Sequence, residues 1–150
     1  MNGIGLTNHY IERFLYNRSK TFKGVFSSDT LPKFKNDFTL ISNLSKKNEV
    51  GTHFVCIAYK KGKLYYFDPM GLPCIVSNIR NYMSKYAKTY TSNNFQFQCL
   101  NSIFCGYYCI LFILLFDLGY SFSEVQKFFS RNCKNNDLLV IELIKHIVSL

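Results

Sequence analysis

The sequence changes abruptly near residue 103 from a polar loop to a long apolar segment, and this change constrains the fold most. Residues 103–116 carry no charged side chain. The run is too short to span a bilayer, so it predicts a buried central helix. Cys105 lies at the junction, where unpaired backbone N–H groups and the positive end of the helix dipole favour a nucleophilic thiolate. Taken alone, Cys105 is better explained as a small buried side chain, the commonest role of a free cysteine.

Two neighbours of Cys105 are consistent with a nucleophile. Gly106 would leave room for a substrate backbone to approach the sulfur, because it has no Cβ. Gln98 lies seven residues upstream, where its side-chain amide could donate to a developing oxyanion beside the backbone N–H of Cys105. The segment therefore predicts covalent catalysis if a general base lies nearby.

A β-hairpin supplies a candidate base. Residues 53–59 are mostly apolar, and residues 64–67 follow them after a short lysine-rich turn, a pattern typical of two paired strands. Pairing would place His53, at the start of the first strand, beside Asp68, at the end of the second. A carboxylate there would orient the imidazole and stabilise its charged form.

The chain has three histidines, and the other two, His9 and His146, lie in segments expected to be helical. By itself, His53 is better explained as a structural histidine with satisfied hydrogen bonds. In chain order, we expect His53 at a strand start, Asp68 at a strand end, Gln98 on a loop and Cys105 at a helix start. For this combination catalysis is the better explanation.

Three short motifs carry these residues: Gly51-Thr52-His53-Phe54, Phe67-Asp68-Pro69-Met70-Gly71 and Gln98-x-x-Asn101-Ser102-x-x-Cys105-Gly106-x-x-Cys109. They resemble the adenovirus-type maturation cysteine proteases, the adenain family, whose relatives occur in virophages and in Polinton or Maverick transposons. The resemblance covers roughly residues 6–116, and the third motif is its most specific part.

The resemblance implies a papain-like, adenain-like α+β fold, in which the helix that carries the nucleophile packs on a small mixed sheet. The matching positions imply that Cys105 is the nucleophile and His53 the base. They also imply that Asp68 is the orienting acid and Gln98 an oxyanion-hole donor.

Two positions depart from the family pattern. Phe54 stands where the family usually has tryptophan, although an aromatic ring is kept. Asp68 stands where the adenovirus enzymes usually have glutamate, whereas aspartate is usual in the related SUMO-protease branch. The spacing from glutamine to cysteine resembles the adenovirus branch, because SUMO proteases place the two one residue closer.

The implied activity is that of a cysteine endopeptidase that cleaves viral capsid or core precursor proteins at glycine-containing sites during virion maturation. A protease for ubiquitin-like modifiers, similar to the SUMO proteases, is the alternative among enzymes. A basic DNA-packaging protein on the same scaffold is the non-enzymatic alternative, although it would have no use for His53 and Cys105 together.

Composition and periodicity favour one folded domain, residues 1–150. Hydrophobic residues make up 48% of the chain, and no repeat or linker divides it. Helices and strands are expected in separate groups, which indicates the α+β class. Besides the central helix and the hairpin, we expect a helix at 7–15, a strand at 39–41, a helix at 79–90, a strand at 95–97, a helix opened by a capping box at Ser121 and Glu124, and a last helix capped by Asn136 and Asp137 that ends near residue 148.

The six cysteines are expected to be reduced thiols, because the N-terminus shows no secretory signal pattern. We therefore expect an intracellular protein, in the host nucleus or a cytoplasmic virus factory and in the virion, and not a secreted one. No metal site is expected, since Cys105 and Cys109 lack a C-x-x-C partner or a nearby histidine. A monomer that needs no cofactor for its chemistry and binds no membrane is predicted.

The formal charge of +9 predicts a surface that attracts polyanions, of which DNA is the obvious one. Many basic domains bind nothing specific, so composition alone leaves this open. The candidate contacts are Lys60, Lys61, Lys63, Arg80, Lys85 and Lys88, the last three interleaved with Tyr82, Tyr86 and Tyr90. The resemblance implies DNA as an activating polyanion, and it also raises an activating peptide. In the adenovirus enzymes a disulfide upstream of the oxyanion glutamine helps to hold that peptide. No cysteine lies between Cys74 and Cys99 here, so this attachment does not carry over.

Met1–Gly5 also matches the pattern that adenovirus-type enzymes cleave, an apolar residue followed by x-Gly-x and then Gly. Cleavage would fall between Ile4 and Gly5, in a self-processing step between molecules. The alternative is that the match is accidental, since glycine-containing N-termini are common.

Overall fold

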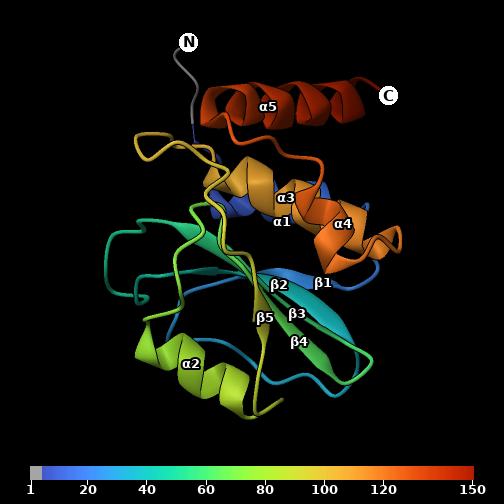
Figure 1. Ribbon diagram of the computed structural model, residues 1–150. Coiled ribbons are helices and arrows are strands. Elements are labelled where there is room, and N and C mark those ends of the chain that lie inside the picture. Colours follow the sequence, from blue (N-terminus) through green and yellow to red (C-terminus); the bar gives the residue numbers. More distant parts are fainter. Residues whose placement is uncertain (1–4) are drawn as a thin grey trace.

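Residues 5–150 are described by the computed structural model, and they form a five-stranded mixed sheet with helices on both faces (Figure 1). The strands lie in chain order across the sheet: β1 (Phe22–Phe26), β2 (Phe38–Asn43), β3 (Phe54–Lys60), β4 (Lys63–Phe67) and β5 (Thr91–Ser92). The pairs β2–β3 and β3–β4 are antiparallel, and the pairs β1–β2 and β4–β5 are parallel. Residues 1–4, which carry most of the predicted self-processing sequence, lie outside the described residues.

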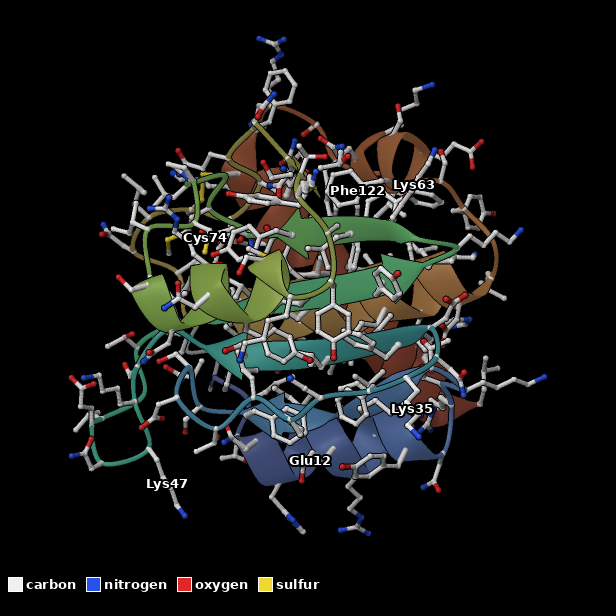
Figure 2. The ribbon with its side chains drawn as sticks, turned by 90° about the horizontal axis from the view of Figure 1, so that it is seen from below. Glu12, Lys35, Lys47, Lys63, Cys74 and Phe122 are labelled. Carbon is white, nitrogen blue, oxygen red and sulfur yellow. A yellow bond between two sulfur atoms is a disulfide. The ribbon has the colours of Figure 1, made fainter. Side chains whose placement is uncertain are left out.

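The helices are α1 (Asn8–Tyr16), α2 (Ser77–Ser84), α3 (Cys105–Asp117), α4 (Phe122–Gln126) and α5 (Cys133–Ser149). Figure 1 shows α1, α3, α4 and α5 on one side of the sheet and α2 on the other, and Figure 2 shows α2 crossing that second face. Helices and strands are segregated along much of the chain. The predicted α+β class is confirmed, as is the central helix packed on a small mixed sheet.

The central strand β3 contributes to two hydrophobic cores because its side chains alternate between the faces. Cys56 and Ala58 pack in the larger core with α3. Val55 and Ile57 pack in the smaller core with α2. A strand buried on both faces explains why the sequence of β3 is an apolar run rather than an alternating one.

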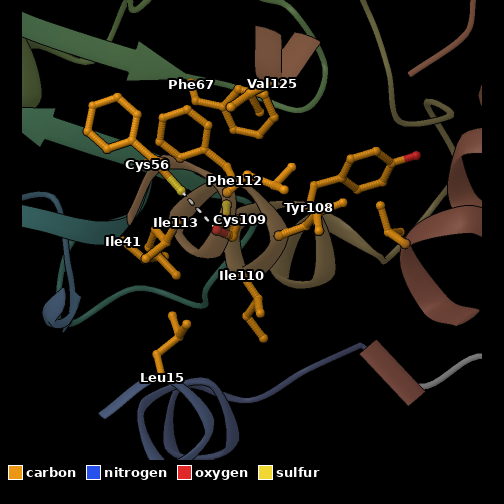
Figure 3. Packing of buried hydrophobic residues seen from close by; sticks show 14 of the residues in the cluster. Leu15, Ile41, Cys56, Phe67, Tyr108, Cys109, Ile110, Phe112, Ile113 and Val125 are labelled. Atoms are coloured by element: carbon orange, nitrogen blue, oxygen red, sulfur yellow. Dashed lines mark hydrogen bonds between the residues drawn. The ribbon is translucent and has the colours of Figure 1, made fainter. Parts of the chain in front are cut away.

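The helix α3 is apolar on nearly all sides because it lies between the sheet and the other helices (Figure 3). The rings of Phe67 on β4 and Phe112 on α3 stack with centroids 4.7 Å apart. The thiol of Cys56 donates to the Cys109 carbonyl over 3.6 Å, the contact drawn as a dashed line in Figure 3. Each fully buried side chain of this size contributes about 1.5–3 kcal/mol by leaving water, so the sheet and α3 fix one another.

Side chains cap the starts of α1, α4 and α5, and of these caps the sequence predicted the one at α4. The Thr7 hydroxyl accepts from Tyr10 N at the start of α1, and the predicted capping box at Ser121 and Glu124 opens α4. The predicted caps of the last helix are wrong. Asn132 caps α5, which begins earlier than expected, and Asn136 and Asp137 lie inside it.

Three other expectations are corrected. Residues 95–97 do not form a strand, because Phe97 N donates to Pro69 O outside the sheet, and the short strand beside β4 is β5 instead. The strand β1 was not predicted. The helix expected at 79–90 is α2, which ends at Ser84, although Tyr86 still packs beside it through an aromatic contact with Tyr82. Within residues 5–150 no helix is both long and apolar enough to cross a membrane.

Candidate active site

The hairpin brings His53 and Asp68 together as its register requires. Cys56 of β3 pairs with Phe67 of β4, so the end of β4 lies beside the start of β3. His53 Nε2–H donates to Asp68 Oδ1 over 2.7 Å, since a carboxylate can only accept. Both residues are buried, with 8% of His53 and 2% of Asp68 exposed. The predicted contact of the imidazole with the carboxylate is confirmed.

Asp68 is itself held by its neighbours. Its Oδ1 also accepts from Met70 N over 2.8 Å. The side chain of Asn93 binds both the N–H and the carbonyl of Asp68. Sequence reasoning missed Asn93, because the polar run Thr-Ser-Asn-Asn in which it lies is typical of an ordinary loop.

The environment of His53 favours its charged form. Burial alone would lower the pKa of His53, but hydrogen bonds to Asp68 and Cys105 and the charges of both groups outweigh burial and raise it from 6.5 to about 9. Because Nε2 is engaged by Asp68, Nδ1 is the ring nitrogen left for the cysteine. The ring is therefore placed between an acid and a thiol, as a base oriented by a third group must be.

Cys105 is the first residue of α3, as predicted, and it is 9% exposed. The preceding residue, Phe104, gives no side-chain hydrogen bond to the start of α3. The backbone N–H groups of the first turn of α3 are therefore not capped by this side chain. Cys109 lies one turn deeper and is fully buried. Burial, aided by Cys56, raises the pKa of the Cys109 thiol well above its ordinary value. Of the two cysteines, Cys105 is the one suited to attack.

Gln98 is buried and tied to the loop that precedes Cys105. Its side-chain Nε2 donates to Ser102 O over 2.9 Å and lies 3.3 Å from Ser102 Oγ. Its backbone N–H donates to Pro69 O over 2.9 Å, which joins this loop to the segment after Asp68. An amide nitrogen carries two hydrogens. Both hydrogens are directed at Ser102, and Gln98 Oε1 has no hydrogen-bond partner. Donation to an oxyanion would require Nε2 to release its longer contact, the one with Ser102 Oγ.

Two glycines of the motifs have structural roles. A Cβ on Gly106 would lie 3.1 Å from Ile11 Cδ1 and 3.2 Å from Leu6 Cβ. The absence of a side chain thus lets the N-terminal segment pack on α3, and the expected role in substrate approach is not supported. A Cβ on Gly71, whose φ is +68°, would lie 2.4 Å from Phe95 O, so glycine lets the loop after Asp68 approach the loop that leads to Gln98.

The helix α5 holds the residue next to Gln98. Asn136 Nδ2 donates to Phe97 O over 3.1 Å. Tyr108 Oη lies 3.2 Å from the same carbonyl and 2.6 Å from Asp137 Oδ1. These contacts explain why Asn136 and Asp137, misread as caps, point into the protein. Side chains of α3 and α5, rather than of the hairpin, therefore hold Phe97, the residue just before Gln98.

A disulfide joins Cys99 and Cys133, which corrects the expectation that all six cysteines are reduced. The fold brings their Cα atoms within 5.0 Å, inside the range that a disulfide bridges. The cysteines without a disulfide are Cys56, Cys74, Cys105 and Cys109. The bond ties the residue after Gln98 to the first residue of α5.

The tyrosines interleaved with the second group of basic residues differ in how far they are buried. Tyr82 is buried and donates to Pro32 O, while the Tyr86 hydroxyl accepts from Phe34 N. Tyr86 is half-buried, and Tyr90 is 40% exposed, so Tyr90 is the most accessible of the three interleaved tyrosines. The candidate DNA contacts lie at the β3–β4 turn (Lys60, Lys61, Lys63), on α2 (Arg80) and after it (Lys85, Lys88).

The lysines do not all lie at one place on the surface. Figure 2 shows Lys35, Lys47 and Lys63 at separate places on its periphery. Lys60 Nζ lies 5.1 Å from the centre of the Phe116 ring and is only partly free for a phosphate. Among residues 5–150, no group of three or more His, Cys, Asp or Glu side chains could hold a metal ion.

No family model and no curated protein matches the chain. Seven solved chains match its structure. One of them is the crystal structure of the selenomethionine ASFV pS273R protease, with a TM-score of 0.43 and 16% sequence identity. The match covers 68% of this chain and 41% of that chain, so the chain spans about two fifths of the length of that protease.

Proposed function

We propose that the chain is a cysteine endopeptidase with Cys105 as nucleophile and His53 as base. The observations that carry this proposal are the buried hydrogen bond between His53 and Asp68 and the position of Cys105 as the first residue of α3. An imidazole held by a carboxylate and adjoining a thiol at a helix start is the arrangement that activates a thiol.

In this mechanism His53 takes the proton of the Cys105 thiol, and the thiolate sulfur attacks the carbonyl carbon of a peptide bond. The oxyanion that forms accepts hydrogen bonds from the Cys105 backbone N–H and from the Gln98 amide. His53 then gives its proton to the leaving amine, and a thioester to the sulfur remains. His53 next takes a proton from water, which attacks the thioester, releases the acid and restores the thiol. Asp68 stabilises the charged imidazole throughout.

The proposed substrates are precursor proteins of a viral particle, cut at glycine-containing sites. This follows from the resemblance of the three motifs to the adenovirus-type proteases. Ubiquitin-like modifiers, which also end in glycine, are the alternative substrates. A DNA-packaging role without catalysis would leave the buried contact between His53 and Asp68 without a purpose.

Alkylation of Cys105 by iodoacetamide, followed by peptide mass mapping, tests the proposal. Native protein should be modified at Cys105 faster than at the buried Cys109, and His53→Ala should slow that reaction. Hydrolysis of a peptide with an apolar-x-Gly-x-Gly sequence should disappear in Cys105→Ala. Equal rates of alkylation in native protein and His53→Ala, together with no hydrolysis, would reject a protease.

The two substrate classes are separated by a second assay. A peptide from a capsid-type site and an intact ubiquitin-like precursor are offered to the same enzyme, with Cys105→Ala as the blank. Cleavage of the peptide but not of the precursor supports a maturation protease. Cleavage of the precursor at its terminal glycine supports the alternative.

A further inference from the structure

Asn93, the residue after β5, is 3% exposed and binds the backbone of Asp68 at both of its polar groups. Asp68 N–H donates to Asn93 Oδ1 over 3.0 Å, and Asn93 Nδ2 donates to Asp68 O over 2.6 Å. The same Nδ2 lies 3.2 Å from Phe95 O. Both polar atoms of this buried side chain are therefore engaged.

These contacts lie where the sheet ends. The pairing of β4 with β5 ends at Tyr66 and Ser92, and its pairing with β3 ends at Phe67. Asp68 is the next residue and lies beyond both ladders. The Asn93 amide takes the place of a peptide group there, because it offers an acceptor and a donor as a paired strand would.

We propose that Asn93 is a positioning residue that holds the Asp68 carboxylate against His53. The inference rests on the proposed cysteine-protease function for its catalytic consequence. Asn93 touches neither the imidazole nor the thiol, and it acts through the backbone of Asp68. Through Phe95 it also connects the acid to the loop that leads to Gln98.

Few side chains could replace this one. Alanine would leave the N–H and the carbonyl of Asp68 without their partner in a buried place. Aspartate would lose the donor and set a second carboxylate beside Asp68. Serine keeps a donor and an acceptor, but its shorter side chain cannot reach both groups at once. Asparagine is thus required by the contact and not only by the loop.

The titration of His53 reports whether this positioning matters. The titratable groups that act on His53 are Asp68, from the end of β4, and Cys105, from the start of α3. If Asn93→Ala lets Asp68 move away, the imidazolium loses part of its support. The pKa of His53 should then fall by on the order of one unit.

The experiment is an NMR titration of the imidazole signals in native protein, Asn93→Ala and Asn93→Ser, with steady-state kinetics on the same samples. The expected results are a lower pKa for His53 in both variants, a smaller shift for serine, and a roughly tenfold lower kcat with little change in KM. Asn132→Ala is the matched control. Its side chain also binds two backbone N–H groups, at the start of α5, without contacting Asp68 or His53.

A merely structural role predicts a different outcome. Asn93→Ala and Asn132→Ala would then both lower the melting temperature and leave the titration of His53 at its native value, which would overturn the inference. If Asn93→Ala does not fold, Asn93→Ser decides on the same criterion. Failure of the proposed function would be visible separately, as hydrolysis that survives Cys105→Ala, and the titration can be read without any activity.

Discussion

The two halves of the candidate site are held in place by different means. His53 and Asp68 lie 15 residues apart on one hairpin, where the backbone ladder sets their distance. Gln98 lies on a loop without strand pairing, and its neighbours Phe97 and Cys99 are tied to α5 by side chains and a disulfide. Strand pairing thus places the hairpin half, with Asn93 binding the residue that follows β4, whereas the oxyanion loop depends on contacts with α5. Damage to α5 should affect the second half alone.

The first prediction concerns Cys105, the first residue of α3, on which both halves of the candidate site act. Cys105→Ala should reduce proteolysis by at least ~10³-fold, because no other group supplies the nucleophile. The fold should persist, since the change removes one sulfur atom at a helix start. Hydrolysis of a quenched fluorescent peptide measures the activity, and circular dichroism measures the fold. Cys109→Ala is the control, and loss of activity in it alone would show that the nucleophile is misassigned.

A second prediction distinguishes the oxyanion loop from the hairpin by comparing two reactions, peptide hydrolysis and alkylation of Cys105. Gln98→Ala should lower kcat by about 10²–10³-fold, the usual effect of losing one oxyanion donor. Alkylation of Cys105 should change little, because that reaction forms no oxyanion. His53→Ala should slow alkylation and hydrolysis together. An equal loss of both reactions in Gln98→Ala would mean that Gln98 supports the local structure instead.

The disulfide offers a way to weaken only the second half. Replacing Cys99 and Cys133 together by serine should lower the free energy of unfolding by about 3–4 kcal/mol, as expected for a bond that closes a loop of 34 residues. Urea denaturation measures this. Turnover should fall less than in Gln98→Ala, since Asn136 still holds Phe97. Alkylation of Cys105 should stay near the native rate.

Reduction of the native protein is the control for that experiment. A strong dithiol reductant should bring the native stability down to that of the double serine variant and leave the variant unchanged. If the two already agree without reductant, the bond does not form in solution. A large loss of alkylation in the variant would show that α5 also supports the hairpin half.

The hairpin half could be predicted from the sequence because its determinants are local. Two apolar runs and a short turn specify the pairing, and the pairing brings the backbone at His53 near the backbone at Asp68. The start of α3 was also predictable, since the change from polar to apolar residues is abrupt there. In both cases residues close together in the sequence are enough to predict the structure.

The other half depends on contacts between residues far apart in the sequence. Phe97 meets Asn136 over 39 positions, and Cys99 meets Cys133 over 34. Nothing in the local pattern marks Asn136 as an interior residue, because asparagine is favoured at helix N-caps and unfavourable inside helices. Asn93 was missed for the same reason, since an asparagine in a polar loop gives no sign that it binds Asp68.

A fourth prediction tests the hairpin half through stability. The pKa of His53 is raised from 6.5 to about 9 in the folded protein. The stability from its charged form is therefore fully present below about pH 6.5, and it is lost as pH rises through about 9. Native protein should lose on the order of 2–3 kcal/mol over that range relative to His53→Gln. Urea denaturation at a series of pH values measures the difference, and parallel curves for the two proteins would contradict the contact with Asp68.

The smallest expected effect lies at the far end of the same hairpin. The β3–β4 turn carries Lys60, Lys61 and Lys63, and we propose that they contact DNA without sequence preference. Changing all three to glutamine should weaken DNA binding by roughly tenfold and flatten the plot of log affinity against log salt by about two to three units, since each phosphate contact contributes about 0.9. The change at Lys60 alone should matter least, because its ammonium already lies over the Phe116 ring.

Fluorescence anisotropy with a labelled duplex, measured over a series of salt concentrations, gives both quantities. The matched comparison changes the second basic group, Arg80, Lys85 and Lys88, which lies on and after α2. An equal flattening in both sets would mean that DNA is attracted by net charge over the whole surface. Binding that does not depend on salt, or that is absent near physiological ionic strength, would remove DNA as a partner. The hairpin would then serve only to place His53 beside Asp68, and its lysines would be an ordinary solvated turn.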